Sequence, residues 1–82
     1  MTTIAARVAS VVAAYFRVPE ADIRPDTNVV RDLGADELAI FDLANDLEAE
    51  FCLSLLPDSD LETCRTVADW TSAIERATKG GN

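Results

Sequence analysis

Apolar residues recur at helical spacing near the start of the chain. They occupy positions 4, 8, 11, 12, 15 and 16, and steps of three and four place such residues on one face of a helix. Thr2 or Thr3 can cap this segment, since hydroxyl side chains accept hydrogen bonds from first-turn amides. Pro19 opposes its continuation, because a residue before proline avoids the helical region. The pattern predicts a helix from about Thr3 to Arg17.

A second apolar face is formed by positions 40, 43, 44, 47 and 51. Asp36 precedes it and is a good N-cap residue, so we expect a helix from about Glu37 to Phe51. The acidic residues at 36, 37, 42, 46, 48 and 50 lie largely off this face. Asp36 and Glu37 also stand at the helix end where negative charge is favourable.

The C-terminal third predicts one short helix and one long one. Asp58, Ser59 and Asp60 follow Pro57 and indicate a short helix near Leu61. Apolar side chains then recur at 67, 70, 73, 74 and 77, after a Thr66–Asp69 pair with capping-box spacing. This predicts a last helix from about Val67 to Thr78.

The connection between the first two long helices, residues 18–35, holds the turn residues Pro25 and Asn28. It also holds apolar residues that a solvated linker would lack: Ile23, Val29, Val30 and Leu33. We therefore expect an ordered loop. The predicted fold is all-α: a four-helix bundle with three long helices, a short third helix and a long first loop. We expect one domain over residues 1–79 and a flexible tail over 80–82.

Composition adds limits on function. A chain of 82 residues with 49% hydrophobic residues can bury one thin core. It has no run of eighteen apolar residues and no basic secretory N-terminus, so we expect a cytoplasmic protein without membrane contact. With no His and only Cys52 and Cys64, we expect neither a metal site nor a disulfide framework.

Charge is unevenly distributed. Residues 32–64 contain ten acids and no Lys or Arg, whereas the whole chain has a net charge of −8. Such a segment repels nucleic acid and anionic lipid and attracts a basic protein surface. Solubility alone would also favour surface acids. The complete absence of bases over this stretch favours a basic protein partner.

The run Asp32-Leu33-Gly34-Ala35-Asp36-Glu37-Leu38 resembles the signature of the acyl carrier protein family, which reads Asp-Leu-Gly-Ala-Asp-Ser-Leu. Further matches follow at Leu43, Leu47, Glu48, Glu50 and Phe51, at Pro57-Asp58 and at Thr66-Val67. The resemblance spans Ile4 to about Ala77. It implies a four-helix bundle that carries acyl groups on a phosphopantetheine arm and docks basic enzyme surfaces through acids of its second helix. The partner-binding residues it implies here are Asp36, Glu37, Leu38, Asp42 and Glu48.

Glu37 departs from the signature at the position of the attachment serine. A carboxylate lacks the hydroxyl that takes up the arm, and Ser10, Ser54, Ser59 and Ser72 do not lie beside the signature. We therefore expect no phosphopantetheine and no other cofactor. Glu37 could instead mimic the charge of the modified serine.

Two functions follow as hypotheses. The first is a non-carrying interaction or regulatory protein that docks a basic biosynthetic or regulatory enzyme as a monomer. The alternative is a carrier of a fatty-acid, polyketide or non-ribosomal peptide pathway, with Glu37 present through engineering or unusual divergence. No catalytic residues are expected, since the chain lacks His and a glycine-rich phosphate loop, and its adjacent acids Asp36 and Glu37 are expected to be exposed. Phe41 and Trp70 are expected to be ordinary core residues, since aromatic side chains at helical spacing usually pack inward. The alternative is that both point inward and fill the space that an acyl chain would use in this family.

Overall fold

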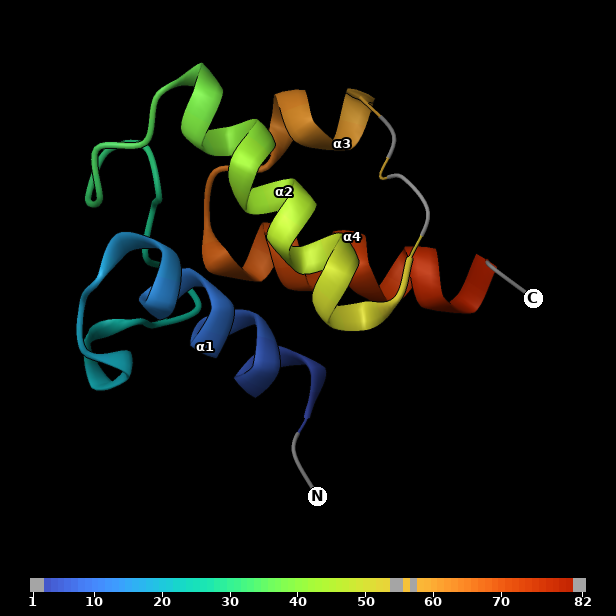
Figure 1. Cartoon of the computed structure of the whole chain (residues 1–82), viewed down its shortest axis with the longest axis horizontal. Coiled ribbons are helices and arrows are strands. Elements are labelled where there is room, and N and C mark those ends of the chain that lie inside the picture. The colour runs from blue at the N-terminus through green and yellow to red at the C-terminus, as the bar shows by residue number, and fades with distance from the viewer. Residues whose placement is uncertain (1–2, 54–55, 57, 81–82) are drawn as a thin grey trace.

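The structure, a computed structural model, describes residues 3–53, 56 and 58–80. Its elements are α1 (Ile4–Phe16), the 3₁₀ turn η1 (Glu20–Asp22), α2 (Glu37–Phe51), α3 (Asp58–Thr63) and α4 (Val67–Gly80). Helix α1 contacts both α2 and α4, and α3 contacts α2. Figure 1 shows the loop between α1 and α2 at one end of the bundle, with α3 running above α4. The predicted all-α fold with a short third helix is confirmed.

The helix ends follow the predicted capping residues closely. Thr3 Oγ1 accepts a hydrogen bond from Ala6 N at 3.1 Å, so Thr3 is the N-cap of α1 rather than its first helical residue. Arg17 adopts the left-handed conformation, with φ of 57°, and is the C-cap of α1. The helix therefore ends at Phe16, two residues earlier than the restriction from Pro19 requires. Helix α2 has the predicted bounds. Helix α4 runs two residues beyond the predicted Thr78, to Gly80, and residues 81–82 of the predicted tail lie outside the described residues.

The core lies between the apolar faces of α1, α2 and α4. Its largest fully buried side chains are Trp70, Leu43, Leu47, Ile74, Val8, Val12, Val29 and Cys64. Trp70 therefore occupies the core, as expected. Phe41 does not: 46% of it is exposed, so the expectation that it packs inward is wrong. The helical periodicity explains this, because Phe41 lies off the face formed by Ile40, Leu43, Ala44 and Leu47.

The first loop is ordered because its carbonyl groups cap α4. Val67 N donates to Thr27 O at 2.9 Å, and Ala68 N donates to Pro25 O at 2.8 Å. These are first-turn amides that have no acceptor within their own helix. Val29 N donates in turn to Arg65 O at 2.8 Å, and the Val29 side chain is fully buried. The loop is thus fixed against α4, and it is this fixed loop that positions the start of α2.

No helix in the described part of the chain combines the length and apolar character needed to cross a membrane.

The predicted capping box at the start of α4 forms. Asp69 N donates to Thr66 Oγ1 at 3.1 Å, and the Asp69 carboxylate accepts from Thr66 N and Arg65 N, both at 3.0 Å. The amides of Thr66 and Arg65 stabilise the ionised form, and they lower the pKa of Asp69 from its usual 3.8. The loop that positions α2 rests on this helix end.

We expect Asp69 to contribute to the acid sensitivity of the fold. Because its pKa is lower in the folded chain, its stabilisation is present above the unfolded pKa and is lost as pH falls below about 4. Asp69→Asn should flatten the dependence of the free energy of unfolding on pH below about 4, as measured by urea unfolding. Glu75→Gln, which changes an exposed carboxylate of α4 outside the capping box, is the control. An unchanged acid slope in Asp69→Asn would contradict this assignment.

Candidate functional site at the head of helix α2

The site is built around the first turn of α2. Asp36 has extended backbone dihedrals, and its carboxylate accepts a hydrogen bond from Ala39 N at 2.8 Å. Glu37 is the first helical residue and is exposed, and Leu38 follows with 75% of its surface exposed. Amides at a helix start favour negative charge, so this turn suits carboxylates and other anions.

The approach to this turn is shaped by a side-chain-to-backbone network. Asn28 Oδ1 accepts hydrogen bonds from Val30 N at 3.0 Å and Arg31 N at 2.8 Å. Asp32 Oδ2 accepts from Asn28 N at 2.9 Å, and this bond, with Arg31 as its second cause, lowers the pKa of Asp32. Gly34 has φ of 74°, a conformation that costs a residue with a Cβ atom. The signature glycine is therefore a backbone requirement of this approach.

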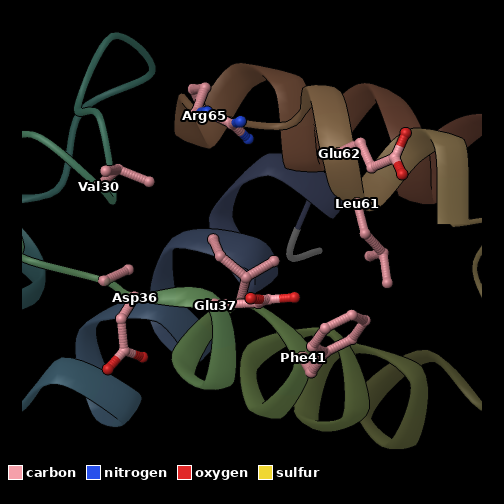
Figure 2. Close-up of a pocket in the computed structure, with 9 residues that line it drawn as sticks. Val30, Asp36, Glu37, Phe41, Leu61, Glu62 and Arg65 are labelled. Atoms are coloured by element: carbon pink, nitrogen blue, oxygen red, sulfur yellow. The ribbon is translucent and has the colours of Figure 1, made fainter.

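A groove of about 560 Å³ lies beside Glu37. It is lined by Val30, Ala35, Asp36, Glu37, Ile40, Phe41, Leu61, Glu62 and Arg65. Figure 2 shows the side chains of Leu61 and Phe41 extending toward one another from α3 and α2, with Val30 on the loop side. Asp36 points away from these apolar side chains in the same view. The loop, α2 and α3 together thus form an apolar groove with charged residues at its edge.

The acids of α2 have different surroundings. Asp42 is exposed and accepts a hydrogen bond from Tyr15 Oη at 3.2 Å. Loss of hydration around the Tyr15 hydroxyl raises its pKa. The hydrogen bond to Asp42 and the negative charge of that residue raise it further. Glu50 pairs with Arg7 at 3.0 Å, and the Arg7 guanidinium also lies 4.4 Å from the centre of the Phe51 ring. Asp46 is exposed between these two contacts along the helix.

Glu48 is buried, with 8% of its surface exposed. Its carboxylate accepts a hydrogen bond from Leu56 N at 2.8 Å. A buried carboxylate needs such a donor, and this one joins α2 to the segment that leads to α3. Glu48 is therefore not part of the exposed surface of α2, and its contact with a partner surface is not supported by its position.

The structure brings together three of the five predicted partner-binding residues: Asp36, Glu37 and Leu38 share the first turn of α2. Asp42 lies further along the exposed side of the helix. Sequence reasoning did not assign Val30, Leu61, Glu62 and Arg65 to the site. These residues lie close together because the first loop is bound to α4 and because α3 lies beside α2. No local sequence pattern predicts either of these two contacts. Among the described residues, no group of three or more His, Cys, Asp or Glu is placed to hold a metal ion.

Comparisons with known proteins match nearly the whole chain. A family model described as "Phosphopantetheine attachment site" matches residues 6–74. An acyl carrier protein of Thermotoga maritima is 37% identical over 73 residues, which cover 89% of each chain. Acyl carrier protein 2 of Pseudomonas aeruginosa is 40% identical over 77 residues, covering 94% of this chain and 96% of that protein.

These findings correct the expectation that no cofactor is involved. The matched family carries a phosphopantetheine prosthetic group, and the relatives are named acyl carrier proteins, so the expectation of none is wrong. The amides of the exposed helix start suit the anionic end of such an arm. Residue 37 itself does not fit a hydroxyl-linked arm, since Glu37 presents a carboxylate.

Members of the family are carrier proteins, which confirms the prediction that the chain is not an enzyme. The matched span, the identity to relatives over most of their length and the helical fold lead to one assignment: this chain belongs to the acyl carrier protein family.

Proposed function

We propose that the protein docks a basic surface of a biosynthetic enzyme through the exposed acids of α2. The observation that supports this most directly is the exposure of four acids at the start of α2 and along it: Asp36, Glu37, Asp42 and Asp46. The stretch from residue 32 to residue 64 contains no Lys or Arg that could neutralise it from within. We take the protein to act as a monomer in the cytoplasm, as its sequence predicts.

The negative charge of these acids supports association with a basic partner surface. Charges of one sign on a surface steer an oppositely charged partner and set the orientation of the encounter. The acids at the helix start lie where the helix dipole favours negative charge. Exposed charges are screened by salt within about 8–10 Å at physiological ionic strength. Docking of this kind should therefore weaken as salt increases.

A suitable test partner is a broad-specificity phosphopantetheinyl transferase, the class of enzyme that attaches the phosphopantetheine arm to carrier proteins. We expect the native protein to bind it with a Kd that rises about tenfold between low and high salt, measured by calorimetry. The double variant Asp42→Asn, Asp46→Asn should raise Kd roughly fivefold at low salt and flatten the salt dependence. Asn at 42 keeps an oxygen that can accept from Tyr15.

The matched control removes the same number of charges elsewhere. Glu20 and Asp22 are exposed acids of η1, outside α2, and their conversion to Gln and Asn also removes two negative charges. We expect Kd within about twofold of the native value for this control. Equal effects of both double variants would indicate that net charge alone governs binding, which would refute docking through α2.

A second candidate is carriage of acyl groups in a fatty-acid, polyketide or peptide pathway. The observation in its favour is the family match itself, since the relatives are named acyl carrier proteins. It shares the docking surface with the first candidate, and the two differ in what happens at residue 37. A mass measurement on the native chain and on a serine variant separates them, as argued in the Discussion.

A further inference from the structure

The outer face of α1 lacks the charged side chains that normally solvate a surface helix. Among its 13 residues, Arg7 is the only charged one. The Arg7 guanidinium is engaged by α2, because it pairs with the Glu50 carboxylate at 3.0 Å and lies 4.4 Å from the centre of the Phe51 ring. The residues of α1 that are exposed are instead Ala5, Ala6, Ser10 and Ala14. A helix that is apolar on all sides is normally buried, so this face is suited to contact with another protein.

Two hollows that share lining residues form one groove along this face, which we call the α1 groove. Their volumes are about 440 and 350 Å³, and both are lined by Val11, Ala14 and Glu50. The floor comes from α1 between Ala6 and Tyr15, which is about 14 Å of helix axis. Figure 1 shows α1 on the side of the bundle away from α3. The α1 groove shares no residue with the groove at the head of α2.

Acids flank the α1 groove on both sides. Asp46 and Glu50 line it from α2, and Glu20 lines it from η1. Glu50 is paired with Arg7, whereas Asp46 and Glu20 form no ion pair within the described part of the chain. An apolar floor between two acidic edges complements an apolar face that carries a base along each edge.

The charge also decides against a second copy of this chain as the occupant. Each copy has a net charge of −8, and a symmetric contact through the α1 groove would bring two faces flanked by acids together. Like charges that meet across an interface oppose association. A basic partner meets no such opposition.

We infer that the α1 groove receives one helix of another protein, with apolar residues on the side toward α1 and Lys or Arg along both edges. The exposed side chains of α1 are short, so a second helix can approach to the usual distance of about 8–10 Å between axes. This interface goes beyond the docking function proposed above, which uses the acids of α2. Asp46 belongs to both surfaces, so the variants that distinguish them leave it unchanged.

The test uses a synthetic peptide of about 18 residues, long enough for partial helix formation, with Ala and Leu on one face and Lys along both edges. A control peptide of the same composition has its Lys residues moved onto the apolar face. We expect the first peptide to bind the native protein with a Kd about fivefold lower than that of the control peptide, measured by NMR titration at low salt. The backbone amide signals of Ala6, Ser10 and Ala14 should shift the most.

Variants of the protein locate the contact. Ser10→Lys places a long basic side chain on the floor of the α1 groove and should raise the Kd of the first peptide about tenfold. The matched control Ser72→Lys makes the same exchange at an exposed position of α4, and its Kd should stay within about twofold of native. Glu20→Gln removes one edge charge and should raise the Kd about threefold. All three residues are exposed, so thermal unfolding should show that the fold is kept.

The outcomes separate this interface from the docking function. If the first peptide binds no more tightly than the control peptide, or if Ser10→Lys and Ser72→Lys weaken it equally, the inference is wrong, whatever the transferase does. A native dimer in sedimentation that Ser10→Lys dissociates would also overturn it, since a second copy would then cover the face. Transferase binding should stay within about twofold of native in Ser10→Lys. If the native protein does not bind the transferase but the peptide results hold, the docking function is refuted and this interface stands.

Discussion

Trp70→Ala should strongly destabilise the folded protein. Trp70 is the largest fully buried side chain among the described residues and lies in the core formed by α1, α2 and α4. Truncating a buried tryptophan costs about 3–5 kcal/mol through lost transfer energy and the cavity left behind. A domain of this size is stable by only about 5–10 kcal/mol, so this loss is about half of its stability. We expect the Tm to fall by roughly 15–30 °C.

Two further variants make this result specific. Ser72→Ala changes an exposed residue of the same helix and should shift the free energy of unfolding by less than about 0.5 kcal/mol. Trp70→Phe keeps most of the ring and removes Nε1, which finds no hydrogen-bond partner within the described part of the chain. Because a buried donor without an acceptor is itself destabilising, Phe should cost far less than Ala. A Tm within about 5 °C of native for Trp70→Ala would contradict the burial of this ring.

The sequence predicted the long helices well because their signals are local. An apolar stripe at helical spacing and a capping residue at its start together defined α2, and Thr66 with Asp69 defined the start of α4. The end of α1 was displaced from Arg17 because a left-handed residue ends this helix, and Arg carries no signal for that conformation. Cys52 ends α2 in the same way, with φ of 56°.

The candidate site was only partly predictable, since it depends on contacts distant in sequence. Glu48 was expected on the surface, but Leu56 N lies where it can donate to this carboxylate, and periodicity cannot place that segment. Phe41 was expected in the core on the strength of its aromatic ring, although the stripe of α2 already excluded it. Arg65 joins the groove only because the first loop pairs with its backbone. Local patterns therefore gave the helix that bears the site but not the walls around it.

The chemistry at residue 37 can be tested directly by restoring the hydroxyl. We expect Glu37→Ser to gain the mass of one phosphopantetheine when incubated with a broad-specificity transferase and coenzyme A. The surrounding signature is intact: Gly34 keeps its positive φ, Asp36 caps the helix, and Leu38 is exposed. A serine here would project from the first turn of a 15-residue helix, whose free amides stabilise a phosphodiester anion. Intact mass spectrometry measures the gain.

A second serine provides the control for position. Glu62→Ser makes the same exchange of carboxylate for hydroxyl on the far wall of the same groove, and we expect no gain there. Loading of Glu37→Ser alone would show that the head of α2 retains the recognition surface of a carrier. If the native protein gained the same mass in this reaction, it would be a carrier as it stands. The arm would then be attached to a residue other than a serine at position 37. Absence of any gain on Glu37→Ser would contradict the prediction, because it would mean that the surface read by the transferase differs although the signature and the helix head are preserved.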